Sequence, residues 1–388
     1  MTARPDVADT FTRAGKRGLQ ITLDHVEDLA RGAAILGTGG GGDPYLGGLM
    51  LRQALQDGLT VELIDVESLD DDDFVVPFGM MGAPTVIVEK IPNGAEMTAA
   101  LRTLEAYRGE QSRAILCAEI GGLNALLPLV LGARCGLPVV DGDGMGRAFP
   151  QLQMTTYHIF GIPAGPMVMA DEYSNTVLID SAAATEVERL GRSMVVAMGG
   201  STSICLYPMH GRDAKRSIVR GTLSLALGLG RTVREARRTS SDPFAALLAY
   251  LRGTHYYQHC RVLFHGKTVD LLRETSGGLA LGQVLIEGTG DCGGRRISIQ
   301  FQNEHLVARE GNEVLTIVPD LIAILDASTA EPITTEGLKY GQRVAVLGIS
   351  AAPIMRSAPA LAVFGPQAFG LTDPFIPLER IHPGTTRT

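Results

Sequence analysis

Three carboxylates follow predicted buried strands, and carboxylates in such positions can do general acid–base chemistry. Glu119 ends the apolar run 114–118, and Asp141 and Asp143 come directly after the run 138–140. The carboxyl ends of parallel strands meet at one edge of a sheet, where ligands of α/β proteins bind. We therefore expect the three side chains to lie in one pocket, where they can move protons or orient a water molecule.

Asn124 and Arg147 are the predicted substrate-binding partners of these carboxylates. Asn124 stands after two glycines at the start of an apolar helix, and Arg147 ends the run DGDGMGR. A structural alternative exists for each group. Asn124 would cap its helix, Glu119 would pair with a core arginine, and the two aspartates would bind Arg147 and the backbone of a glycine turn.

A run of four glycines predicts a loop whose backbone a ligand can approach closely, because ordering such a run costs much conformational entropy. The alternative is a flexible turn. The run lies between two predicted helices and lacks a Walker lysine, so it fits neither a P-loop nor a Rossmann context. The predicted substrate-binding residues in this loop are Gly39, Gly40, Gly41, Gly42 and Asp43.

Ser201 lies in the small-residue run 199–203, which follows the apolar run 194–198. We expect residues 194–198 to form a strand and the following run to form a nest of backbone N–H groups that binds an anion. Ser201 therefore joins the predicted substrate-binding residues. Cys205 stands nearby and can attack an electrophilic carbon, but free cysteines are more often buried structural residues.

A divalent metal such as zinc is an alternative route to an activated water. Asp141 and Asp143 have a D-x-D spacing that suits oxygen ligation, and His255 and His259 would share one face of a helix. Two carboxylates alone do not complete a metal site, and no glutamate completes an H-E-x-x-H pattern around the histidines. These four residues are the candidate metal ligands.

The order of the predicted elements favours two domains. In residues 21–253, apolar helices alternate with short β-like runs, which is typical of an α/β domain with a largely parallel sheet. In residues 254–352, β-branched runs broken by glycine pairs predict a smaller β-rich domain. Residues 1–20 are expected to form an N-terminal arm, and the C-terminal segment 353–388 to pack back on the first domain.

The individual elements follow from periodicity and from glycine and proline breaks. A polar cluster, Gln302–Glu304, is expected either to form a turn or to close the pocket from the second domain. The predicted helices are 24–36, 46–55, 97–107 and 123–131. The predicted strands are 60–66, 74–78, 85–88, 114–118, 138–140, 194–198, 261–264, 281–287, 297–302, 314–318, 321–325 and 343–346.

Composition favours a soluble globular protein of about two domains. The chain has 388 residues and a net charge of −8, which argues against a nucleic-acid surface. Five widely spaced cysteines suit a reducing compartment, and no apolar run approaches the ~18 residues of a membrane span. We therefore expect a cytoplasmic protein with no membrane partner, and a homo-oligomer is the general expectation for such chains.

Several long motifs in fixed order resemble the S-methyl thiohydantoin desulfurase family. The resemblance covers about residues 20 to 375 and includes both predicted domains. In the first domain it is carried by LGTGGGGDPYLG, FGMMGAP, AEIGGLNALLPL and VVDGDGMGRAFPQLQM, and in the second by FHGK, FQNE, VPDL and LKYG.

The resemblance implies a bacterial hydrolase that acts on a hydantoin-like ring. The family activity removes the sulfur substituent of an S-methylated thiohydantoin, releasing methanethiol and leaving a hydantoin, and related cyclic amides or amidines are further substrates to consider. The family is similar in genomic company and annotation to hydantoinase and oxoprolinase systems, so the resemblance implies a hydantoinase-type partner as well. The alternative function is a non-catalytic subunit that binds a hydantoin-like metabolite.

Overall fold

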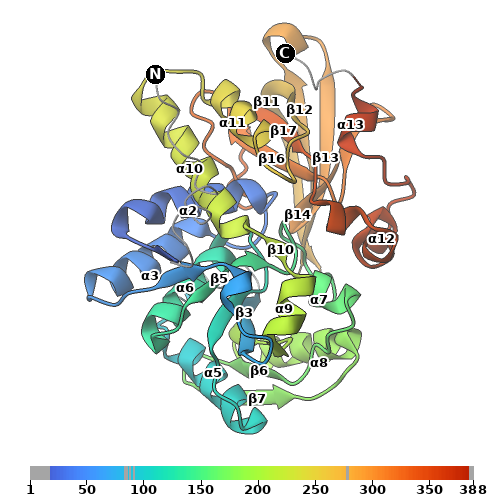
Figure 1. Ribbon diagram of the computed structural model, residues 1–388. Helices are drawn as coiled ribbons and strands as arrows, with labels where there is room; N and C mark the ends of the chain where they lie inside the picture. The colour runs from blue at the N-terminus through green and yellow to red at the C-terminus, as the bar shows by residue number, and fades with distance from the viewer. Residues whose placement is uncertain (1–17, 83–85, 87–88, 91, 277–278, 384–388) are drawn as a thin grey trace.

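The computed structural model describes residues 18–82, 86, 89–90, 92–276 and 279–383, which form two β-sheets with helices packed around the first (Figure 1). Of the predicted strand 85–88, only Val86 belongs to the described residues. None of the helices within these ranges is long and apolar enough to cross a membrane.

The first sheet is mixed, with parallel strands at its centre. Strands β2, β5, β4 and β3 run parallel in that order, and the strands beyond β2 and β3 are antiparallel to their neighbours. The predicted α/β domain is thus confirmed, with antiparallel extensions at both ends of its sheet. The strands are β1 (Leu19–Gln20), β2 (Glu62–Ile64), β3 (Phe74–Gly82), β4 (Ala114–Cys117), β5 (Val139–Asp143), β6 (Met167–Ala170), β7 (Thr176–Ile179), β8 (Ser201–Cys205), β9 (Met209–His210) and β10 (Val219–Arg220).

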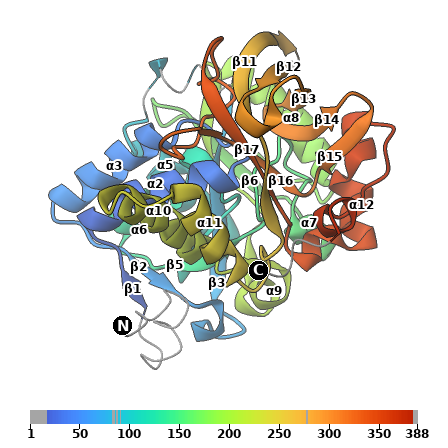
Figure 2. The same cartoon turned by 90° about the horizontal axis from the view of Figure 1, so that it is seen from above.

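The two faces of this sheet carry separate apolar clusters, because successive side chains of a strand point in opposite directions. On β4, Ile115 and Cys117 belong to the cluster under α2, α3, α5, α6 and α10, whereas Ala114 and Leu116 belong to the cluster under α8 and α9. Figure 2 shows α2, α3, α6 and α10 side by side. These helices are α2 (Leu23–Leu36), α3 (Pro44–Gln56), α5 (Ala95–Arg108), α6 (Gly122–Cys135), α8 (Ala184–Ala197), α9 (Gly211–Ser217) and α10 (Thr222–Arg238).

The predicted strand 194–198 is wrong, because nearly all of it belongs to helix α8. Val187, Gly191 and Val195 are buried at intervals of four residues, which is the spacing of one helix face, and Val196 is 78% exposed. The apolar run Met194–Met198 resembles a strand only when the polar residues before it are ignored. The run 199–203 therefore follows a helix and leads into β8.

The second sheet is antiparallel and forms a half-barrel, which confirms the β-rich domain. Its strand order is β15-β14-β13-β12-β11-β17-β16, and β14 is the strand that the sequence patterns missed. The strands are β11 (Cys260–Ser276), β12 (Leu279–Gly288), β13 (Arg296–Gln302), β14 (Glu304–Glu310), β15 (Glu313–Ile317), β16 (Leu321–Asp326) and β17 (Arg343–Ile349). Short helices α7 (Thr156–Ile159) and α11 (Pro243–Arg252) precede this sheet in the chain, and α12 (Ala358–Phe364) and α13 (Leu378–Ile381) follow it.

The C-terminal segment joins the two domains. The ring of Phe364 in α12 lies 4.8 Å from the ring of Phe149, which follows β5 in the first domain. Arg356 donates 2.6 and 2.8 Å hydrogen bonds to the buried carboxylate of Asp320, at the start of β16. The segment therefore contacts both domains.

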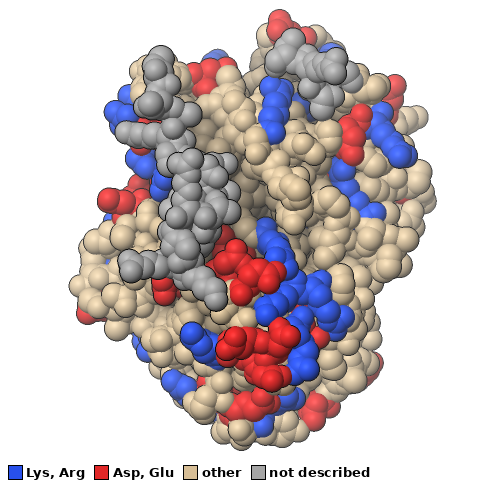
Figure 3. Space-filling view, in the orientation of Figure 1, with Lys and Arg blue, Asp and Glu red and all other residues tan. Residues whose placement is uncertain are grey.

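The charged surface has no large region of one sign in the orientation of Figure 3, where acidic and basic side chains lie next to one another. In the acidic turn Asp70–Asp73, for example, the carboxylate of Asp71 accepts a 2.7 Å hydrogen bond from Lys215. This turn is therefore a solvated, ion-paired surface feature.

Candidate active site

The glycine loop connects α2 to α3 and needs glycine for two separate reasons. Gly39, Gly41 and Gly42 have φ angles of +94°, +82° and +79°, a region that L side chains rarely adopt. Gly40 has an ordinary φ, but a Cβ atom there would lie 2.1 Å from Oε1 of Glu304. A Cβ on Gly41 would lie 2.4 Å from the backbone of Gly121. The loop is thus packed between α6 and β14.

Hydrogen bonds fasten this loop to the second domain. The backbone N–H of His305 donates to the carbonyl of Thr38 over 2.8 Å. Both the N–H and the hydroxyl of Thr335 donate to the carbonyl of Gly39, over 2.9 and 3.0 Å. The glycine loop therefore forms part of the junction between the domains. It is fixed by hydrogen bonds, unlike the flexible turn that was the alternative prediction.

Arg147 is fully buried at the same junction and serves as a link between the domains. Its guanidinium donates to the hydroxyl of Thr38 and to the carbonyls of His305 and Asp320, over 2.8 to 3.0 Å. Both Nη atoms of Arg147 therefore donate to acceptors of the protein itself, whereas Arg147 was predicted to bind substrate. Burial lowers the pKa of Arg147 to about 10, so it stays charged at neutral pH.

A cavity of about 90 Å³ opens beside the glycine loop, between the two domains. Gly41, Gly42, Glu119 and Asn124 line it, so the structure brings together part of the predicted site. Glu304, from the second domain, lines it as well. The described lining residues are Gly41, Gly42, Gly79, Met80, Met81, Gly82, Ala118, Glu119, Leu123, Asn124, Met145, Phe149, Pro150, Gln151, Leu152, Arg192, Ile204, Asn303 and Glu304.

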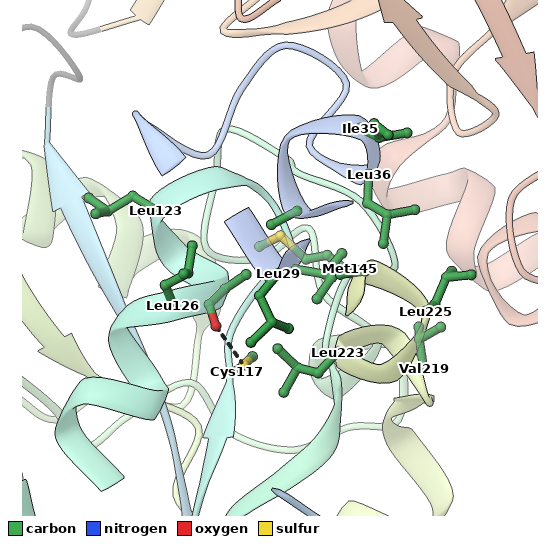
Figure 4. Packing of buried hydrophobic residues seen from close by; sticks show 14 of the residues in the cluster. Leu29, Ile35, Leu36, Cys117, Leu123, Leu126, Met145, Val219, Leu223 and Leu225 are labelled. Carbon is green, nitrogen blue, oxygen red and sulfur yellow. Dashed lines mark hydrogen bonds between the residues drawn. The ribbon is translucent and has the colours of Figure 1, made fainter. Parts of the chain in front are cut away.

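Apolar packing holds the backbone from which Glu119 projects. The end of β4 at Cys117 is surrounded by side chains that come from three helices and from the loop after β5 (Figure 4). Leu29 and Leu126 belong to this cluster, together with Met145. Because such an interior is closely packed, the position of Glu119 two residues later is well defined.

Glu119 is 7% exposed and is oriented by an amide side chain. Asn124 donates from Nδ2 to Oε1 of Glu119 over 2.5 Å, and its own Oδ1 accepts from the N–H of Met80 over 2.7 Å. The N–H of Phe149 donates to Oε2 over 3.4 Å. Burial raises the pKa of Glu119 to about 7, so the carboxyl can give or take a proton near neutral pH.

Glu304 is the second buried carboxyl of the cavity. It begins β14, after the single turn residue Asn303, whose φ is +58°. Its Oε2 atom has no hydrogen-bond partner within the described residues. Burial, followed by the negative charge of Glu119, raises the pKa of Glu304 well above its ordinary value. Glu304 was absent from the predicted catalytic residues, although the cluster Gln302–Glu304 was one expected closure of the pocket.

Asp143 lies behind the cavity and does not line it. Its Oδ2 accepts 2.9 Å hydrogen bonds from the N–H groups of Ile120, Met145 and Gly146. It thereby joins the segment after Glu119 to the loop that follows β5. Burial raises the pKa of Asp143 to about 7. In this position Asp143 holds the backbone of two lining segments.

Asp141 lies at the N-terminus of α10, away from the first cavity. It accepts hydrogen bonds from the N–H groups of Leu223 and Ser224, each 3.0 Å, and from the hydroxyl of Ser224. Burial raises the pKa of Asp141 to about 6. With His255 it lines a second cavity, of about 410 Å³, so the expectation of one pocket for all three carboxylates is wrong.

The remaining predicted residues also lie outside the first cavity. Asp43 caps α3, accepting a 2.9 Å hydrogen bond from the N–H of Tyr45, and Ser201 is buried at the start of β8. His255 and His259 follow the end of α11 at Arg252, so they share no helix face. No group of three or more His, Cys, Asp or Glu residues that could hold a metal ion occurs in the described part of the chain.

Together, the fold and the cavity define a two-domain α/β protein with a carboxyl-lined pocket at its domain junction. Residues 24–181 match the S-Me-THD-like N-terminal domain, and residues 182–378 match the S-Me-THD-like C-terminal domain. The chain therefore belongs to the S-Me-THD-like family. This result confirms the resemblance to S-methyl thiohydantoin desulfurases that the sequence motifs carry.

A solved structure has the same fold. It is the crystal structure of a protein from Chromobacterium violaceum, which superposes with a TM-score of 0.77 and is 25% identical in sequence. The alignment covers 93% of this chain and 100% of that chain. No curated protein gives a significant match.

Proposed function

We propose that this protein is a hydrolase that removes the sulfur substituent of an S-methylated thiohydantoin, or of a closely related ring. The observation that carries the proposal is the pair of buried carboxyls, Glu119 and Glu304, which reach one cavity from different domains and have raised pKa values. Burial raises the pKa of both carboxyls, and the negative charge of Glu119 raises that of Glu304 further, which favours one ionised and one protonated group, as acid–base hydrolysis requires.

In the proposed reaction, ionised Glu119 takes a proton from water while the water oxygen bonds to the ring carbon that carries sulfur. Protonated Glu304 then donates its proton to sulfur as the carbon–sulfur bond breaks, so methanethiol leaves. The second water proton moves to the ring nitrogen, which gives the hydantoin carbonyl. The proton on Glu119 returns to Glu304, and both carboxyls regain their starting states.

The glycine loop supports the binding of developing negative charge. Gly41 and Gly42 line the cavity, and no hydrogen-bond acceptor for their N–H groups occurs within the described residues. Free backbone N–H groups beside a reacting carbon stabilise an anionic transition state. We assign this role to the two amides.

An apolar wall supports the recognition of the methyl group on sulfur. Met80, Met81 and Met145 line the cavity together with Leu123 and Phe149. Thioether and aromatic side chains make favourable contacts with a small polarizable group. This wall faces the same cavity as the two carboxyls.

Direct attack by water is favoured over attack by a thiolate. The described lining residues include no cysteine, serine or threonine. Cys205 is fully buried, and burial raises the pKa of its thiol well above the ordinary value, so the reactive thiolate is disfavoured. Dialysis against a chelator, followed by metal analysis and assay, separates this route from a metal-assisted one.

The direct test is to incubate the purified protein with S-methylated thiohydantoins and to measure both products. Release of methanethiol, detected with a thiol reagent, must match hydantoin formation, detected by mass spectrometry. A protein that binds hydantoins but releases no thiol, alone or with a hydantoinase, would instead be the non-catalytic binding subunit.

The two carboxyls predict a bell-shaped dependence of kcat/KM on pH. The base works only when ionised, so kcat/KM should rise as the pH increases through about 7, the pKa of Glu119. The acid works only when protonated, so kcat/KM should fall at higher pH, where Glu304 loses its proton. Initial rates across the pH range measure both limbs. A rate that falls steadily from acid to neutral pH would contradict these roles.

A further inference from the structure

The second cavity, of about 410 Å³, has no part in the proposed reaction. Among the described residues, the two cavities have no lining residue in common. The second cavity lies where β5 and the start of α10 meet the end of α11 and residues 253–257, which lead to β11. It is large enough to hold a small organic molecule.

Aromatic rings form one wall of this cavity. The ring of Tyr256 lies 4.8 Å from that of His255 and 6.5 Å from that of Tyr257, with the planes inclined by 61° and 70°. Tyr250, on α11, lines the same cavity. The hydroxyl of Tyr257 donates to the carbonyl of Gly146 over 3.0 Å, which holds its ring in place. The wall is therefore an aromatic surface that exists before any ligand binds.

Two carboxylates also line the cavity. Asp141 is 7% exposed, and its carboxylate accepts two N–H groups and one hydroxyl from the start of α10. Asp65 accepts a 2.8 Å hydrogen bond at Oδ1 from the N–H of Glu67, and no donor to its Oδ2 occurs within the described residues. Burial and, to a smaller extent, the negative charge of Asp65 raise the pKa of Asp141 to about 6. The two carboxylates therefore repel each other, and a nearby cation would relieve that repulsion.

The one cationic side chain known to line this cavity, Arg220, is already paired. Its Nη1 lies 2.6 Å from Oε1 of Glu67, and its Nη2 donates to the carbonyl of Lys215 over 2.7 Å. The charge of Arg220 is thus balanced by Glu67. The negative charges of Asp65 and Asp141 have no such partner among the residues that the structure describes.

We propose that the second cavity binds a small quaternary ammonium ion. The faces of aromatic rings attract such cations, and the two carboxylates supply the opposite charge. The carboxylate of Asp141 already accepts three hydrogen bonds from α10, so it attracts a ligand mainly by its charge. A quaternary ammonium has methyl groups that pack on rings, whereas a primary ammonium needs acceptors for three N–H groups. This inference does not depend on the proposed hydrolysis.

The test compares choline with 3,3-dimethylbutan-1-ol, which has the same shape but carries carbon in place of the charged nitrogen. Titration of each probe with the purified protein, followed by NMR of the probe, gives both dissociation constants. Choline should bind more tightly by roughly 10-fold or more, from its contact with ring faces and carboxylates together. Ethanolamine, which carries a primary ammonium on the same two-carbon chain, should bind more weakly than choline.

Two variants locate the binding site. Tyr256→Leu removes one ring face, and Asp141→Asn removes a charge but keeps an oxygen that can accept hydrogen bonds from α10. Each should weaken choline binding by roughly 3- to 30-fold. The matched controls are Tyr340→Leu and Asp291→Asn, which change exposed side chains that line neither cavity and should leave the choline affinity unchanged. Thermal unfolding of every variant identifies any loss of fold.

Glu119→Gln distinguishes the two cavities, because it changes the charge of the first cavity alone. Choline should bind this variant as tightly as the wild type, and a loss of affinity would instead place the cation in the first cavity and overturn the proposal. Equal affinities for choline and 3,3-dimethylbutan-1-ol, or no binding of choline, would also overturn it. The same holds if ethanolamine binds more tightly than choline, or if Tyr256→Leu and Asp141→Asn both keep the wild-type affinity.

Discussion

A Glu119→Gln variant is expected to lose kcat by about 10²- to 10⁴-fold, the range for removal of a general base. Glutamine keeps the size of the side chain and can still accept a hydrogen bond from Asn124, so the cavity should keep its shape. The loss should appear in kcat, because glutamine cannot take the proton of the attacking water. Methanethiol release, measured at several substrate concentrations, separates kcat from KM.

Two further measurements make this prediction specific. Glu313→Gln, an exposed carboxylate at the start of β15, should leave kcat unchanged. The charge of Glu119 helps to raise the pKa of Glu304. In Glu119→Gln this charge is absent, so the fall of the residual activity at high pH should begin at a lower pH than in the wild type. A variant with full activity would remove Glu119 from the reaction.

A Gly41→Ala variant is expected to lose about 2–5 kcal/mol of unfolding free energy, combining the cost of positive φ with that of overpacking. Gly41 has a φ of +82°, and an added Cβ would lie 2.4 Å from the backbone of Gly121. Neither backbone can move without disturbing the start of α6. Denaturant unfolding gives the free energy, and the assay should show reduced activity because Gly41 lines the cavity.

Gly58→Ala is the matched control for this substitution. Gly58 has nearly the same φ, +84°, but an added Cβ there meets no atom within 4 Å. Its substitution should cost only about 1–2 kcal/mol, the price of the left-handed conformation. Equal losses in the two variants would show that the contact with Gly121 contributes nothing.

The sequence predicts much of the fold where its periodicity is unambiguous. The structure confirms the helix before the glycine loop as α2 and the buried strand 114–118 as β4. It also confirms every strand of the second sheet except β14. The strand β14 was not predicted because its apolar run, residues 306–308, is only three residues long and is flanked by the polar residues His305 and Arg309. The run 194–198 misled because a five-residue apolar segment fits a strand and a helix face equally well.

The candidate site could be predicted residue by residue only within the first domain. Glu119 and Asn124 share a short motif between β4 and α6, so strand-end reasoning places them together. Glu304 is the first residue of β14 in the other domain, and its cluster, Gln302–Glu304, could be predicted only as either a turn or a closure of the pocket, because no local pattern relates it to Glu119. The distance from Asp141 to the cavity has a different cause. Its carboxylate accepts hydrogen bonds from N–H groups at the N-terminus of α10. The residues next to Asp141 in the sequence do not predict this contact.

The contact between Gly40 and Glu304 limits how the chain can evolve. The carboxylate of Glu304 occupies the space in which any side chain at position 40 would begin. A side chain at position 40 would require the Glu304 carboxyl to leave its present position, which would displace one of the two proposed reacting groups. We therefore expect a substitution at position 40 to disturb the Glu304 carboxyl and, through it, the proposed chemistry.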